Sequence, residues 1–119
     1  MLGNYFANRA LSHYFQYRTV WMGLHLADPT PAGDLTTEMS TGGYMRRKLG
    51  FGTPAARSIA STGSVVFSAL VGAQVTHFGF WTNQVGQHLL AAQELDTPLV
   101  VTASAQVLIG PGDIVIQLA

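Results

Sequence analysis

The stretch "VWMGLHLADP", residues 20–29, decides the fold class, because its apolar residues recur at every second position and the pattern then stops. Apolar residues at alternate positions from 20 to 26 would face one side of a strand, and Trp21, Gly23 and His25 the other side. Asp28 and Pro29 then favour a turn. The sequence therefore predicts a two-faced strand that ends at a structural corner.

Further strand-like segments follow this one, and turn-forming residues separate them. Residues 75–81, "VTHFGFW", give the strongest signal because they are rich in β-branched and aromatic side chains. The others are residues 49–51, 64–67, 89–94, 105–109 and 114–118, the last two joined by Gly110–Asp113 as a four-residue hairpin loop. Together they predict a mainly β fold: a single antiparallel β-sandwich or jelly-roll-like domain over residues 1–119.

One helix and one long loop complete the expected organisation. Asn4 is suited to cap a helix over about residues 4–17, whose apolar stripe would comprise Phe6, Ala7, Ala10, Leu11, Tyr14 and Phe15. Residues 27–43 are rich in Thr, Gly and Pro and show no period, which predicts a long ordered loop or arm. Loops of this length are often functional.

The composition excludes several classes of protein. The 119 residues include six basic and six acidic ones, so that only 10% are charged and the formal net charge is zero. This balance argues against a nucleic-acid-binding surface and favours association with other subunits. Cysteine is absent, which removes disulfides and thiolate chemistry. With no bilayer-length apolar run and no signal-peptide pattern, we expect no membrane partner and synthesis in the cytoplasm.

A search for catalytic or cofactor chemistry gives only weak candidates. His25 and Asp28 could serve as a general base and its orienting group, but no nucleophile is identifiable, so a structural corner is favoured. His25 would then brace that corner through a hydrogen bond, close to His77 or Tyr44. The four histidines lack metal-ligand spacing, and residues 50–52 are better explained as a bend than as a phosphate loop. We therefore expect no metal, no cofactor and no enzyme activity.

The stretch Arg46-Arg47-Lys48 holds half of the basic residues. Three charges in a neutral protein would bind a phosphate backbone weakly, so an ion pair with an acidic neighbouring subunit is the favoured interpretation. Trp21 and Trp81 belong to apolar strands and are expected to anchor the core.

Short motifs in a fixed order connect these segments to a known family. They are Leu-His-x-Ala-Asp-Pro at residues 24–29, Glu38 ahead of Gly-Gly-Tyr-x-Arg at residues 42–46, and Val-Thr-His-x-Gly-x-Trp at residues 75–81. Over nearly its whole length the chain resembles a family of small virion proteins of tailed bacteriophages. It departs from that pattern at Thr82-Asn83, where an acidic residue and a glycine-rich turn are common.

The resemblance implies a structural protein of the virion without catalytic activity. The favoured role is a capsid cement or decoration protein that binds the major capsid protein and copies of itself, with a trimer as one option. The alternative is a tail fibre, baseplate or connector component that contacts tail subunits or a host receptor. The absence of heptads and of a repetitive shaft narrowly favours the capsid surface. The candidate structural or subunit-contact residues are His25, Asp28, Pro29, Glu38, Tyr44, Arg46, Arg47, Lys48, His77 and Trp81.

Overall fold

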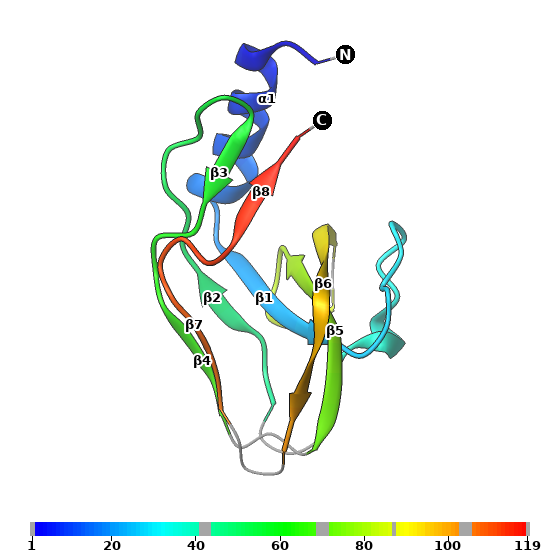
Figure 1. Cartoon of the computed structure of the whole chain (residues 1–119). Coiled ribbons are helices and arrows are strands. Elements are labelled where there is room, and N and C mark those ends of the chain that lie inside the picture. Colours follow the sequence, from blue (N-terminus) through cyan, green and yellow to red (C-terminus); the bar gives the residue numbers. More distant parts are fainter. Residues whose placement is uncertain (1, 41–43, 69–71, 87, 103–105, 119) are drawn as a thin grey trace.

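The computed structural model describes residues 2–40, 44–68, 72–86, 88–102 and 106–118, and its fold is mainly β with one N-terminal helix (Figure 1). The helical elements are α1 (Asn4–Leu11), which continues as one π-helical turn (Ser12–Gln16), and a short 3₁₀ turn (Leu35–Thr37). The strands are β1 (Val20–His25), β2 (Arg47–Leu49), β3 (Ser58–Ala60), β4 (Val65–Phe67), β5 (Ala73–Trp81), β6 (Leu89–Val101), β7 (Val107–Ile109) and β8 (Val115–Gln117). The predicted antiparallel β fold is confirmed.

The principal sheet has the strand order β2-β1-β5-β6, and all of its pairings are antiparallel. β1 and β5 are the two strands with the clearest sequence signals, and they lie side by side at its centre. Met22 opposes Phe80 and Leu24 opposes Phe78, on the face that is buried in the core. The alternate residues of both strands therefore line the opposite face, which we call the outer face.

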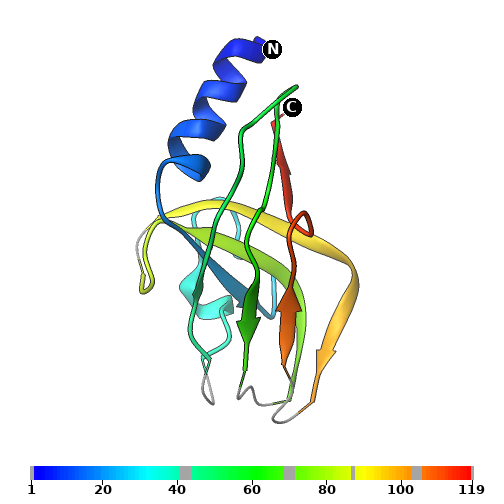
Figure 2. The ribbon, with the colours of Figure 1, turned by 90° about the vertical axis from the view of Figure 1, so that its left-hand side faces the viewer.

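A second layer of short strands covers the inner face of this sheet. β3 pairs with β8 and β4 pairs with β7, while Phe51 bridges to Ser61. Figure 2 shows β4 and β7 in front of the long, curved β5–β6 hairpin. The hydrophobic core between the layers includes Met22, Leu24, Phe78 and Phe80 from the sheet and Phe51, Ile59, Phe67, Val107 and Ile114 from the second layer.

The predicted hairpin between residues 105–109 and 114–118 is wrong, and Ala105 itself lies outside the described residues. β7 pairs with β4 and β8 pairs with β3, so the two strands have different partners and do not form a hairpin with each other. Gly110–Asp113 forms a turn, since the Asp113 N–H donates to the Gly110 carbonyl at 3.1 Å. The turn is a bulge between β7 and β8, and it does not reverse the direction of the chain.

One unpredicted strand and one strand boundary also differ from the expectation. β3 lies in a segment of small residues that gives no strand signal, and a tight turn with positive φ at Ala56 (49°) and Arg57 (68°) leads into it. β6 continues to Val101 instead of ending near Glu94, because a bulge opposite Thr76 carries the pairing past Pro98. Both features depend on neighbouring strands and not on local pattern.

The helix begins as predicted near Asn4, but the N-cap residue is Gly3 and no side chain caps it. The buried stripe consists of Ala7, Leu11 and Phe15. Phe6 and Tyr14, which were expected on that stripe, are exposed by 61% and 47%. The helix is therefore apolar on two faces, only one of which packs against the body of the protein. Among the described residues, no helix has the length and apolar character needed to cross a membrane.

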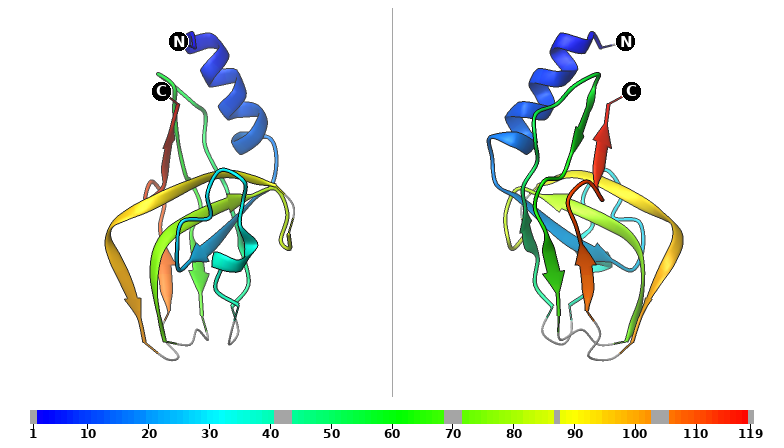
Figure 3. Two further views of the ribbon diagram at one scale, coloured as in Figure 1. Left: turned by 90° about the vertical axis from the view of Figure 1, so that its right-hand side faces the viewer. Right: turned by 60° about the vertical axis from the view of Figure 1, so that its left-hand side comes forward.

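The loop that begins at residue 27 folds back onto its own chain. Its returning part pairs with the end of β1, because the Leu26 N–H donates to the Thr37 carbonyl at 2.8 Å and the Met39 N–H donates to the Leu24 carbonyl at 2.9 Å. Figure 3 shows the loop lying over the outer face of the sheet. The described part, up to residue 40, is thus not a limb extended toward other subunits, and residues 41–43, including the motif's Gly42 and Gly43, lie outside the described residues.

Candidate functional site

At its centre, the outer face of the principal sheet carries two glycines in place of side chains. Gly23 of β1 and Gly79 of β5 are directly opposed, between the pairs Trp21–Trp81 and His25–His77. A β-carbon on Gly23 would lie 2.6 Å from Glu38 Oε2, and one on Gly79 would lie 2.4 Å from His25 Nε2. The two glycines therefore provide the room in which polar side chains lie flat against the sheet.

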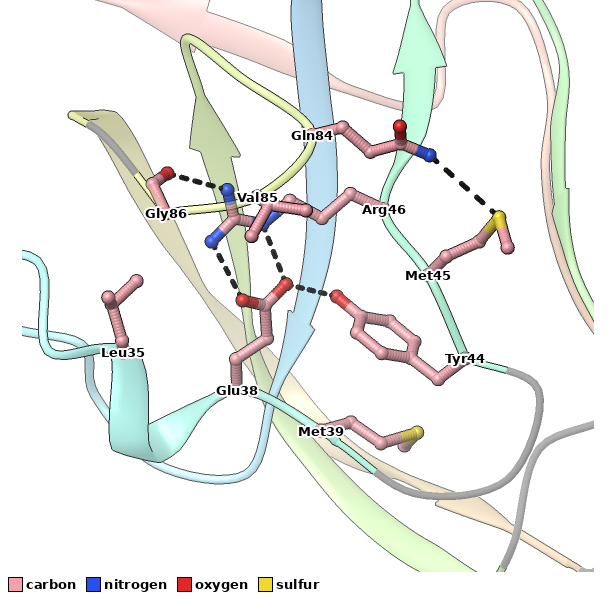
Figure 4. A pocket seen from close by; sticks show the side chains of 9 residues that line it. All are labelled: Leu35, Glu38, Met39, Tyr44, Met45, Arg46, Gln84, Val85 and Gly86. Carbon is pink, nitrogen blue, oxygen red and sulfur yellow. Dashed lines mark hydrogen bonds and ion pairs between the residues drawn. The ribbon is translucent and has the colours of Figure 1, made fainter.

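A buried ion pair occupies this room (Figure 4). Arg46 donates two parallel hydrogen bonds to Glu38, from Nε to Oε2 and from Nη2 to Oε1, each at 2.8 Å. The Tyr44 hydroxyl also donates to Glu38 Oε2 and accepts a hydrogen bond from the Leu24 N–H at 3.0 Å. The side chains of Arg46 and Glu38 are 2% and 12% exposed. Such a pair is stable only when its remaining donors and acceptors are also satisfied.

The other terminal nitrogen of the Arg46 guanidinium binds backbone carbonyls. Nη1 donates to the backbone carbonyls of Asn83 and Gly86, at 2.8 and 2.9 Å, in the turn between β5 and β6. The guanidinium carbon also lies 4.1 Å from the centre of the Trp81 ring, in a cation–π contact. Arg46 thus joins the returning loop, the sheet and the β5–β6 turn.

Trp81 continues the contacts to His25. The Trp81 indole N–H donates to His25 Nε2 at 3.2 Å, and His25 Nδ1 lies 2.9 Å from Thr37 Oγ1. Because an indole nitrogen can only donate, Nε2 must be the acceptor, so the proton of neutral His25 is on Nδ1 and is donated to Thr37. The Thr37 hydroxyl in turn donates to the Asp34 carbonyl at 3.0 Å. We call Thr37, His25, Trp81, Arg46, Glu38 and Tyr44 the outer-face network.

The electrostatics keep this network in one protonation state. Burial, assisted by the hydrogen bond to Glu38, raises the pKa of Tyr44, so its hydroxyl remains a donor. Burial lowers the pKa of His25 below its ordinary value of 6.5, with Arg46 and His77 adding to the effect and Glu38 opposing it. His25 is therefore neutral at pH 7, as the geometry of its hydrogen bonds requires.

A hollow of about 520 Å³ lies over the ion pair, and Figure 4 shows the side chains that line it. Its floor contains Glu38, Tyr44 and Arg46, while its rim carries the exposed apolar side chains of Leu35 and Val85, which are 50% and 81% exposed. The polar groups of the floor are already bound to one another. The hollow is thus suited to packing against an apolar group and not to proton transfer.

The structure does not assemble the candidate catalytic pair. His25 is fully buried, with both ring nitrogens engaged, and the exposed Asp28 carboxylate accepts a hydrogen bond from the Thr30 N–H at 2.8 Å. Pro29 is buried and its carbonyl accepts from the Asp34 N–H at 2.6 Å, which closes the loop. Within the described residues, no group of three or more His, Asp or Glu side chains is placed to hold a metal ion.

The three residues of the basic stretch differ in burial. Arg46 is buried against Glu38 of its own chain, so the expected ion pair with a neighbouring subunit is wrong for Arg46 and stays a prediction for Arg47 and Lys48. Arg47 is half-buried, and Lys48 is exposed over the Trp21 ring, with Nζ 5.5 Å from the ring centre. His77 is paired with His25 on the adjacent strand, and its Nε2 lies 3.8 Å from the exposed Glu94 carboxylate.

Several members of the site are absent from the sequence-based candidates. Thr37, which fixes the His25 tautomer, and the carbonyls of Asn83 and Gly86, which accept from Arg46, gave no local signal. Gly23 and Gly79 were recognisable in retrospect, because each occupies the centre of a strand pattern where glycine weakens the strand unless something approaches closely.

We predict that Gly79→Ala destabilises the protein by about 1–3 kcal/mol, because the new β-carbon would overlap the His25 ring. Urea unfolding followed by tryptophan fluorescence measures the loss. Gly50→Ala is the matched control, since its β-carbon would lie 3.6 Å from Thr62 Oγ1, an ordinary contact. Equal stability of the two variants would contradict the close packing described here.

Arg46→Met is expected to cost about 3–5 kcal/mol of unfolding free energy at pH 7, since it leaves the Glu38 carboxylate buried without a countercharge. Adding Glu38→Gln should recover part of this loss, because the charge disappears while an acceptor for Tyr44 remains. The control is Lys48→Met, which removes an exposed charge from β2, two residues further along the chain. The interpretation fails if both single variants unfold at the same urea concentration.

Stability is also expected to fall on acidification. Since the His25 pKa is lowered in the folded state, the unfolded chain takes up a proton first as the pH falls through about 6.5, and unfolding becomes more favourable until the lowered pKa is reached. Melting temperatures of the wild type and of His25→Gln between pH 8 and pH 4 test this. The variant should lose part of the dependence, whereas His13→Gln, a change at an exposed histidine, should retain it.

The family model described as podophage GP4 fiber I protein gp80 matches residues 1–117. No curated protein matches the sequence. The family is one of phage virion structural proteins, in agreement with the resemblance seen in the motifs, but its description names a fibre and not a capsid protein. Because the match spans nearly the whole chain, the protein belongs to this family of podophage fiber proteins.

Proposed function

We propose that the chain is a structural subunit of a podophage tail fibre and that it has no catalytic role. The observation that supports this most strongly is the match of residues 1–117 to a fibre protein family. It favours the tail location over the capsid cement role that the absence of heptads suggested. The expected partners are accordingly tail subunits and further copies of this chain.

The use of the motif residues supports a structural role. His25, Glu38, Tyr44, Arg46 and Trp81 bind one another in the outer-face network, with their polar groups directed to partners in the same chain. Their shared task is to hold the returning loop and the β5–β6 turn against the sheet. The motifs of the family thus specify a rigid shape, and the exposed surface is left for contacts between subunits.

The exposed apolar residues support assembly with other subunits. Large side chains exposed by 60% or more occur on α1, just after the π-helical turn, on the β5–β6 turn and on the strands β6 and β7, and they comprise Tyr5, Phe6, Tyr17, Val85, Val100 and Leu108. Exposed aromatic residues are enriched where proteins bind one another. A subunit that contacts several neighbours in a fibre would use such surfaces.

Immunogold labelling of intact virions with an antibody against this chain tests the proposal. We expect gold at the tail fibres and a bare capsid, and virions that lack the chain should lose fibre density while retaining heat resistance. Gold distributed over the capsid, together with heat-sensitive particles in the absence of the chain, would instead identify a cement protein. An antibody against the major capsid protein is the control for labelling of the shell.

A further inference from the structure

The exposed side of α1 has the composition of a protein interface. Tyr5, Phe6 and Tyr17 are 79%, 61% and 77% exposed, and they lie beside the exposed Arg9 and Arg18. Together with Tyr14 these residues form what we call the helix patch. Tyr and Arg are the residue types most enriched among those that dominate binding energy. Its Phe6, Arg9 and Tyr14 also border a hollow of about 400 Å³, which offers room for a partner's side chain.

The helix patch is basic, and its charges have no acidic partner in the described part of the chain. Neither Arg9 nor Arg18 takes part in an ion pair there, and the Arg18 guanidinium lies 5.9 Å from the centre of the Tyr14 ring. In the sequence, every Lys and Arg precedes residue 58, whereas Glu94, Asp96 and Asp113 are the charged residues that follow. The two halves of the chain therefore carry opposite net charge.

The matching acidic surface lies on the outer part of β6. Glu94, Asp96, Pro98 and Val100 are exposed at every second position, and we call them the β6 stripe. The Glu94 side chain is 79% exposed and Val100 is 71% exposed. β6 is an edge strand, because it stands last in the sheet order β2-β1-β5-β6. The stripe thus combines two carboxylates with apolar groups on which tyrosine rings can pack.

We propose that the helix patch of one copy of this chain binds the β6 stripe of a second copy. The two surfaces have opposite charge, and both combine exposed apolar groups with those charges. The aromatic residues would supply most of the affinity, while the ion pairs would fix orientation and make association sensitive to salt. This inference deepens the proposed function and rests on it for its biological setting.

The position of the two surfaces determines the kind of assembly. α1 lies at one end of a molecule whose longest dimension is 44 Å, and the acidic part of β6 lies toward the other end (Figure 1). The contact is therefore between different surfaces of the two copies, and a bound pair still offers one free helix patch on one copy and one free β6 stripe on the other. Such a contact adds copies in a row unless the rotation between them closes a ring.

A charge exchange between two variants tests the contact. The first variant, Arg9→Glu with Arg18→Glu, makes the helix patch acidic, and the second, Glu94→Lys with Asp96→Lys, makes the β6 stripe basic. Analytical ultracentrifugation over a range of concentrations should show each variant associating about tenfold more weakly than the wild type, because like charges then meet. An equimolar mixture should regain association, since the acidic patch of one variant meets the basic stripe of the other.

Three further measurements complete the test. Tyr17→Ser should weaken association, Lys48→Glu, an exposed charge outside both surfaces, should leave it unchanged, and added salt should weaken it in the wild type without any substitution. Circular dichroism verifies that each variant is folded.

A wild-type protein that stays monomeric at every concentration and salt would overturn the inference. So would wild-type association of the second variant alone, which would indicate contact between two helices. Either result leaves the virion location untouched, whereas gold on the capsid with intact self-association refutes only the fibre proposal.

Discussion

The need to satisfy a buried carboxylate organises this protein. Glu38 lies against the bare centre of the sheet, and its two oxygens receive hydrogen bonds from Arg46 and Tyr44. Arg46 is in turn held by backbone carbonyls and by the Trp81 ring. Removing any single partner would leave a charge or donor buried without compensation. For this reason residues from the end of β1, the returning loop, β5 and the β5–β6 turn form one mechanical unit.

The sequence predicted the parts of the fold that depend on local pattern. The two-residue period of β1 and β5 and the helix near Asn4 were recognisable because each element buries one face of its own. β3, the far half of β6 and the pairing of β7 and β8 were not, because partners distant in the sequence determine them. Likewise, the pattern identified Glu38, Tyr44 and Arg46 as candidates but gave no means of pairing Arg46 with Glu38 in preference to a neighbouring subunit.

The three short stretches that carry the resemblance noted in the sequence are separate along the chain and meet in space. Residues 24–29, 38–46 and 75–81 contribute His25, Glu38, Tyr44, Arg46, Gly79 and Trp81 to one face of the sheet. A shared motif of this kind indicates a shared framework, since its polar groups are occupied by one another. The exposed side of α1 and the outer part of β6 lie outside these stretches and are not part of the outer-face network.

The tether between Arg46 and the carbonyls of Asn83 and Gly86 has a consequence for protein engineering. Tips of β-hairpins usually accept foreign peptides, which makes them convenient places for display. Here the turn between β5 and β6 supplies the carbonyls that accept hydrogen bonds from the buried Arg46 guanidinium, so lengthening this turn would withdraw those acceptors and loosen the outer-face network. A peptide inserted without loss of stability should be placed in a turn whose backbone groups form no hydrogen bonds with side chains of other segments.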